Sequence, residues 1–257
     1  MGILEGRNIL VTGVTLNTSI AYAVAQEAQH QGANVVVTNL PRAVSLTRRV
    51  VQKLDPVPPV LELDVCDDDM LAALPDQLRD LGMTSLDGVL HSIAFANPER
   101  ALGGAFLNTA WPDVATALQT SAFSLKSLTM SVRDLLHEGS AVVGLTFDAS
   151  VTWPAYDWMG VAKAALESCN RYLARYLGPD GIRCNLVAAG PVDTIAKNAI
   201  PGAHSFNDVW SDRAPLGWNS KDASPVAAVA CALMSDIFRK TTGEIIHVDG
   251  GLFSTGA

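Results

Sequence analysis

The sequence lacks the features that mark metal-binding, nucleic-acid-binding and membrane-spanning proteins. Four cysteines are scattered along 257 residues without metal-ligand spacing, which fits a reducing compartment. The longest run of basic residues is Arg48-Arg49 and the net charge is −8, so the sequence offers no basic patch that would bind nucleic acid. No apolar run approaches the ~18 residues that span a bilayer, and the first residues do not form a signal peptide. We therefore expect a soluble cytoplasmic protein with no metal site, no nucleic-acid partner and no membrane contact.

What the chain does contain is a regular alternation of short apolar runs and helical segments. Apolar residues make up 49% and charged residues 17%, which suits one compact core. Seven strands are expected, at residues 8–12, 34–38, 60–63, 87–91, 141–147, 182–187 and 244–248. The main helices are expected at 19–31, 43–54, 111–137, 155–178 and 224–234, whereas 190–220 shows little regular pattern. This order predicts an α/β fold, a single doubly wound parallel sheet (Rossmann-type) with helices on both faces, in one domain over residues 1–257.

The segment Tyr156-Asp-Trp-Met-Gly-Val-Ala-Lys163 places a tyrosine seven residues before a lysine. On a helix, seven steps of about 100° bring the two side chains within about 20° of each other, two turns apart. A nearby cation is expected to lower the pKa of the phenol, which would then donate a proton or a hydrogen bond to an oxygen that becomes negative. An ordinary amphipathic helix with a surface lysine fits the same seven-residue segment, so other parts of the chain must decide.

Polar and small-residue turns follow four of the predicted strands. In such sheets the ligand lies outside the carboxyl ends of the strands, at the point where the strand order reverses. Gly13 lets a phosphate approach the backbone, and Ser19 can cap the next helix. Asp64 and Val65 could hold an adenine ring. Further turns lie at 92–94 and 189–194. Each could be an ordinary turn, but four on one edge favour a dinucleotide site.

With these residues in place, the chain resembles the short-chain dehydrogenase/reductase superfamily, and within it the bacterial enoyl-acyl-carrier-protein reductases. The spacing from tyrosine to lysine is the most specific feature, because ordinary members of the superfamily have four residues where this chain has seven. The matching motifs extend from residue 9 to residue 251 and are Gly13-x5-Ser19-Ile20, Leu63-Asp64-Val65, His91-Ser92-Ile93-Ala94-Phe95, Tyr156-x6-Lys163, Asn185-Leu-Val-Ala-Ala-Gly190-Pro191 and Gly243-Glu-Ile-Ile-His-Val-Asp-Gly-Gly251.

The resemblance implies reduction of a trans-2-enoyl thioester by hydride from a nicotinamide. Tyr156 and Lys163 are implied as the catalytic pair, with Tyr156 on the thioester oxygen and Lys163 on the nicotinamide ribose. The implied cofactor-binding residues are Gly13, Ser19, Ile20, Leu40, Asp64, Val65, Ser92, Ile93, Ala94, Lys163, Gly190, Pro191, Val192 and Thr194. NADP requires a cation for its 2′-phosphate, and the segment after strand two offers only Arg42. We therefore expect NADH, with NADP less favoured.

The resemblance also implies a substrate loop at about residues 195–213. The implied substrate contacts are Phe95, Ala96, Phe147, Tyr156, Met159, Ala196 and Ile200. Many family members have a second tyrosine where this chain has Phe147, which is interpreted as a wall beside the nicotinamide. The acyl carrier protein is the implied partner, and Lys197 and Arg213 are the basic residues available to its acidic surface. Family members are usually homotetramers, for which the 111–137 helix is a candidate interface.

Three alternatives are kept. Carbonyl reduction, as in ketoacyl reductases, normally uses a serine about a dozen residues before the tyrosine, but Ser150 lies only six residues before Tyr156. A non-catalytic dinucleotide sensor would be expected to lack the tyrosine or the lysine. An enoyl reductase of a specialised secondary-metabolite pathway would have the same motifs as one of type II fatty-acid biosynthesis.

Overall fold

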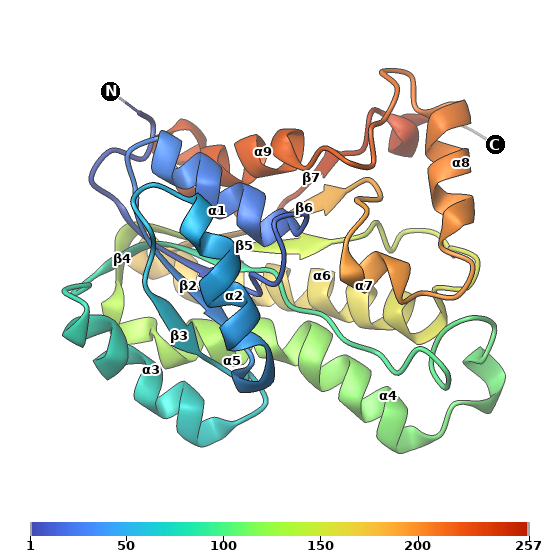
Figure 1. The fold of residues 1–257 in the computed structure, drawn as a ribbon, viewed down its shortest axis with the longest axis horizontal. Coiled ribbons are helices and arrows are strands. Elements are labelled where there is room, and N and C mark those ends of the chain that lie inside the picture. The colour runs from blue at the N-terminus through green and yellow to red at the C-terminus, as the bar shows by residue number, and fades with distance from the viewer. Residues whose placement is uncertain (1, 256–257) are drawn as a thin grey trace.

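The computed structural model describes residues 2–255 and has one seven-stranded sheet between two layers of helices (Figure 1). All pairs of strands are parallel, and their order is β3-β2-β1-β4-β5-β6-β7. The order reverses between β1 and β4, and a doubly wound sheet binds its ligand at such a point. The predicted fold class is confirmed. The strands are β1 (Asn8–Thr12), β2 (Asn34–Asn39), β3 (Val60–Glu62), β4 (Leu86–His91), β5 (Leu136–Thr146), β6 (Arg183–Ala189) and β7 (Ile245–Val248).

Helices cover both faces of the sheet and bury two separate apolar cores. One face is covered by α1 (Ile20–His30), α2 (Val44–Val50) and α9 (Ser224–Met234). The other is covered by α3 (Asp68–Asp80), α4 (Trp111–Leu118), α5 (Ser124–Ser131) and α6 (Asp157–Leu177). Two short helices follow β6, of which α8 (His204–Arg213) lies at the right-hand end of Figure 1 and α7 (Ile195–Asn198) lies nearer its centre. Within residues 2–255, none of these helices has the length and apolar character needed to cross a lipid bilayer.

Two helix starts follow directly from local chemistry. The Ser19 hydroxyl accepts the backbone N–H of Tyr22 at 3.3 Å, as expected of a cap for α1. The Asp67 carboxylate accepts the N–H groups of Asp69 and Met70, both at 3.0 Å, and begins α3. Each side chain replaces hydrogen bonds that the first turn of a helix cannot make for itself.

The structure departs from the predicted elements at the 111–137 helix, at the start of β5 and within residues 190–220. The expected helix at 111–137 is interrupted by a π-helical turn at Gln119–Phe123, and regular α-helix ends at Ser131. Strand β5 begins earlier than expected, because Leu136 already pairs with Leu86 before an irregularity that includes Gly139 at φ +94°. Residues 190–220 were expected to be irregular, yet they contain α7 and α8. The apolar residues Phe206, Val209 and Trp210 have helical spacing, and that signal was available in the sequence.

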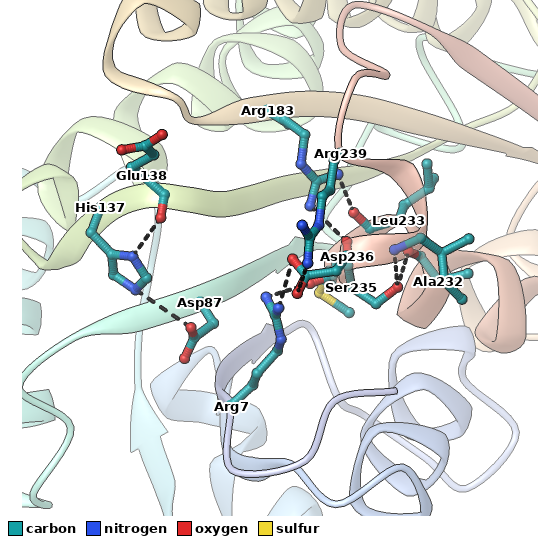
Figure 2. Close-up of polar contacts among 12 residues, drawn as sticks. Arg7, Asp87, His137, Glu138, Arg183, Ala232, Leu233, Ser235, Asp236 and Arg239 are labelled. Carbon is teal, nitrogen blue, oxygen red and sulfur yellow. Dashed lines mark hydrogen bonds and ion pairs between the residues drawn. The ribbon is translucent and has the colours of Figure 1, made fainter. Parts of the chain in front are cut away.

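At the opposite edge of the sheet, where the strands begin, charged side chains contact the C-terminus of α9 (Figure 2). The buried Arg183 guanidinium donates to the carbonyl oxygens of Leu233 and Ser235 at 2.6 and 3.0 Å, at the C-terminus of α9. Arg7 pairs with Asp236 at 2.9 Å beside it (Figure 2). Guanidinium groups compensate the unpaired carbonyls and the negative dipole of a helix C-terminus. These residues therefore have a structural role at this edge.

Candidate active site

A cavity of about 720 Å³ lies along the carboxyl ends of the strands, at the edge where a ligand is expected. It passes the N-terminus of α1, which favours a phosphate through its free N–H groups and its dipole. Most of the residues predicted to bind a cofactor line this cavity, namely Gly13, Ser19, Ile20, Leu40, Asp64, Val65, Ser92, Ile93, Ala94, Lys163 and Thr194. Residues from several separate turns therefore meet around one cavity, whose size suits a dinucleotide.

Gly13 allows the chain to turn sharply at the floor of the cavity. Its φ of +82° is strained for other residues, and a Cβ built on it would lie 2.1 Å from the carbonyl oxygen of Ser92. The turn after β1 thus packs directly on the turn after β4. Glycine is required by this backbone contact.

Three of the predicted cofactor residues, Gly190, Pro191 and Val192, are buried and do not line the cavity. A Cβ on Gly190 would lie 2.7 Å from ring atoms of both Trp210 and Trp218. The Trp218 indole N–H donates to the Pro191 carbonyl oxygen at 2.8 Å. The turn after β6 is therefore covered by two tryptophans, and its glycine makes room for their rings.

Lys163 is buried, with 6% of its surface exposed, and lines the cavity. Its Nζ donates to the carbonyl oxygen of Leu145 at 2.9 Å. Burial lowers the pKa of Lys163 to about 8, and the nearby Glu167 carboxylate opposes part of that shift. The interpretation as a surface lysine is thereby excluded, and the ammonium is available to a ligand in the cavity.

Tyr156 is also buried, at 7% exposure, but it precedes helix α6 and is not part of it. Its pKa is raised well above its usual range, first by burial and then by the Glu167 carboxylate. The prediction that a neighbouring cation lowers this pKa is therefore wrong. A phenol of this kind keeps its proton at neutral pH and acts as a hydrogen-bond donor.

Glu167 was not identified from the sequence, although it lies four residues after Lys163 on the same face of α6. Its carboxylate accepts from the Thr146 hydroxyl at 3.0 Å and from the backbone N–H of Ala149 at 3.2 Å. Burial raises the pKa of Glu167, while these hydrogen bonds oppose the rise. A glutamate one turn from the lysine was the available signal for it.

Five aromatic rings pack together, from Phe147, Trp153, Tyr156, Phe206 and Trp210, and we call them the aromatic cluster. The Phe147 centroid lies 5.2 Å from that of Tyr156 and 5.5 Å from those of Phe206 and Trp210. Phe147 therefore packs against Tyr156, whereas its expected place beside the nicotinamide stays a prediction. Helix α8 supplies two of the rings, so it covers the tyrosine.

The residues predicted to contact substrate fall into two groups. Phe95 and Ala196 line the cavity. The others pack in or against the apolar core that contains the aromatic cluster, and these are Ala96, Phe147, Tyr156, Met159 and Ile200. Their side chains contact one another in this structure, so an acyl chain must move some of them to reach Tyr156.

The prediction that Lys197 is a basic residue at the portal is wrong. Only 9% of Lys197 is exposed, and its Nζ donates to the Asp193 carboxylate and, at 2.8 Å, to Asn207. The hydrogen bond from Lys197, with others from Ser220 and Asn207, lowers the pKa of Asp193 to about 2. Lys197 therefore joins α7 to α8, whereas Arg213 is exposed at the end of α8.

Comparison with known proteins gives a consistent result. The family model described as Enoyl-(Acyl carrier protein) reductase matches residues 13–253. An Enoyl-[acyl-carrier-protein] reductase [NADH] of Mycolicibacterium smegmatis is 43% identical, and the alignment covers 97% of each chain. Its counterpart from Mycobacterium avium is 42% identical over 97% of each chain, and one from Nostoc sp. is 37% identical over 96% of each. The chain belongs to the enoyl-acyl-carrier-protein reductase family.

Proposed function

We propose that this protein reduces trans-2-enoyl thioesters, carried by an acyl carrier protein, to saturated acyl thioesters with NADH in type II fatty-acid biosynthesis. The observation that carries the proposal is the buried pair of Tyr156 and Lys163 beside a dinucleotide-sized cavity at the carboxyl edge of the sheet. The names of the relatives, which specify both this reaction and NADH, support it.

The chain's own residues can hold the cofactor along the cavity. The N-terminus of α1, with Gly13 and Ser19, suits the pyrophosphate, and Asp64 with Val65 suits the adenine. Lys163 would donate to the ribose hydroxyls of the nicotinamide half. NADH, when bound, would supply the hydride for C3 of the substrate. The cavity wall after β2 offers Leu40, Pro41 and the exposed Arg42, which is a poor site for a 2′-phosphate.

Tyr156 stabilises the charge that develops on the substrate. Addition of hydride at C3 moves an electron pair toward the thioester carbonyl, whose oxygen becomes an enolate oxygen. The protonated phenol donates a hydrogen bond to that oxygen, and the bond strengthens as charge accumulates. The surrounding aromatic cluster excludes water and lowers the local dielectric, which makes this hydrogen bond stronger.

Residues 195–213 form the substrate loop in this proposal. Helix α8 packs Phe206 against Tyr156 and Trp210 against Phe147, so the enoyl group reaches the phenol only when these rings move aside. Phe95 and Ala196 then meet the acyl chain from the cavity, and Ala96, Met159 and Ile200 meet it from the apolar core.

Assembly and location follow from the same proposal. Helix α6 exposes Tyr172 and Tyr176 at 63% and 72%. Phe123, just before α5, and Met130, on α5, are exposed at 56% and 44%. Aromatic side chains exposed to this extent are typical of surfaces that bind a second copy. We propose that this surface lies in a homotetramer, and that the protein works in the cytoplasm beside its acyl carrier protein.

Steady-state oxidation of NADH and NADPH, with a medium-chain 2-enoyl thioester and with the matching 3-ketoacyl thioester, tests the proposal. We expect turnover of the enoyl substrate with NADH, and kcat/KM at least about tenfold lower with NADPH, because the cavity wall after β2 is a poor site for its 2′-phosphate. Preferred reduction of the ketoacyl substrate would favour a carbonyl reductase. The candidate serine of that alternative, Ser150, is exposed and donates to the Asp148 carboxylate at 3.0 Å. Binding of NADH without any oxidation would instead favour a sensor.

A further inference from the structure

Tyr156 lies between two residues with unusual backbone conformations. Ala155 has a φ of +62° and Asp157 a φ of +41°, and within residues 2–255 they are the only residues other than glycine with positive φ. Such conformations cost energy in residues that carry a Cβ, and they persist only where surrounding contacts fix them. The direction of the Tyr156 side chain depends on this short segment, so the contacts that fix it also fix the phenol.

The contacts come from the connection between β4 and α4. One oxygen of the Asp157 carboxylate, Oδ2, accepts the backbone N–H of Gly104 at 2.6 Å and that of Ala105 at 3.0 Å. The backbone just before Tyr156 is hydrogen-bonded as well, because the Gly103 N–H donates to the Ala155 carbonyl oxygen at 2.9 Å. A single carboxylate oxygen thus joins the strained segment to two consecutive amides.

Stacked aromatic rings hold the same connection from the side. The Trp158 ring stacks on Phe106 with centroids 4.9 Å apart and planes 20° apart. The Trp158 indole N–H donates to the Phe106 carbonyl oxygen at 3.1 Å, and its backbone N–H donates to the carbonyl oxygen of Ala101 at 3.2 Å. Residues 101–106 are therefore attached to residues 155–158 by five hydrogen bonds and one ring stack, and only the Asp157 side chain contributes a charge to them.

We propose that Asp157 is a positioning residue, whose carboxylate holds the backbone around Tyr156 in the strained conformation that directs the phenol toward the thioester oxygen. Asp157 does not touch the reacting atoms and acts only through Tyr156. The inference rests on the proposed role of Tyr156 in the reduction. It adds a residue from outside the cavity, since Asp157 does not line it.

Two substitutions separate the hydrogen bonds from the backbone strain. Asp157→Gly removes the acceptor while glycine adopts positive φ without strain, so the variant retains the fold. Asp157→Asn keeps an oxygen at the same place for both amides, and asparagine tolerates positive φ. We expect Asp157→Gly to lower kcat by about 10- to 100-fold, as misplacement of a reacting group does, with the Kd for NADH within about twofold of wild type. Asp157→Asn should restore kcat to within about threefold of wild type.

Asp67→Gly is the matched control, because the Asp67 carboxylate also accepts two backbone N–H groups at a helix start but lies far along the chain at α3. Its kcat should stay at the wild-type value. If Asp157→Gly has wild-type kcat, or if Asp157→Asn is as impaired as Asp157→Gly, the proposal is wrong. Tyr156→Phe is measured alongside: wild-type turnover there would remove Tyr156 from the mechanism, whereas impaired Tyr156→Phe with normal Asp157→Gly would refute only the positioning role.

Discussion

Replacement of Tyr156 by phenylalanine is expected to lower kcat by about 100- to 1000-fold, the usual cost of losing one donor to a developing oxyanion. The phenyl ring keeps its place in the aromatic cluster, where Phe147 lies 5.2 Å away, so packing should hardly change. The Kd for NADH should stay within about twofold of wild type, because the phenol acts on the substrate. Single-turnover rates and nicotinamide fluorescence titration measure the two quantities separately.

A second buried tyrosine provides the control for that experiment. Tyr22, at 6% exposure, lies in α1 within the apolar core under α1, α2 and α9, and its hydroxyl has no role in the proposed reaction. Tyr22→Phe should therefore leave kcat unchanged. If Tyr156→Phe retains the wild-type kcat, the phenol is not the group that stabilises the enolate.

Replacement of Lys163 by methionine is expected to weaken NADH binding by about 100-fold, as loss of a charge-assisted contact in a buried site does. The lowered pKa shows that the folded protein disfavours the buried ammonium, so its removal should not destabilise the fold. We expect a Tm equal to or higher than that of wild type, together with the loss of affinity. Unchanged affinity for NADH would refute the ribose role, whatever the Tm.

The same lysine predicts a pH dependence in the wild-type protein. Because the pKa of Lys163 is about 8 in the folded chain, its ammonium loses its proton as the pH rises through that value. Affinity for NADH should then fall above pH 8, by at most about tenfold per pH unit for one proton. Lys163→Met should bind NADH weakly and without this dependence. A wild-type affinity that stays constant well above pH 8 would show that the charge does not contribute.

The strands and the cavity at their carboxyl ends could be predicted because they follow from local patterns. β-Branched runs such as residues 34–38 form buried strands, and Ser19 and Asp67 cap helices as their chemistry requires. The carboxyl ends of parallel strands meet at one edge, so Gly13, Asp64 and the 92–94 turn come together without further information.

What could not be predicted depends on contacts between distant segments. The pKa of Tyr156 follows from burial under α8 and from Glu167, and the spacing of tyrosine and lysine contains neither. Gly190 was predicted to bind the cofactor, but Trp210 and Trp218 cover it and it does not line the cavity. Lys197 was predicted to lie at the portal, but its ammonium pairs with Asp193. Tertiary packing decides each of these cases.

The most direct test of the central claim is to follow the transferred hydrogen. The protein is incubated with NADH that carries deuterium at both hydrogen positions of nicotinamide C4 and with a medium-chain 2-enoyl thioester, and the product is examined by mass spectrometry and NMR. We predict a saturated thioester with deuterium at C3 and a solvent proton at C2. Deuterium at any other carbon, or an unreduced double bond with enzyme that binds NADH, would contradict it.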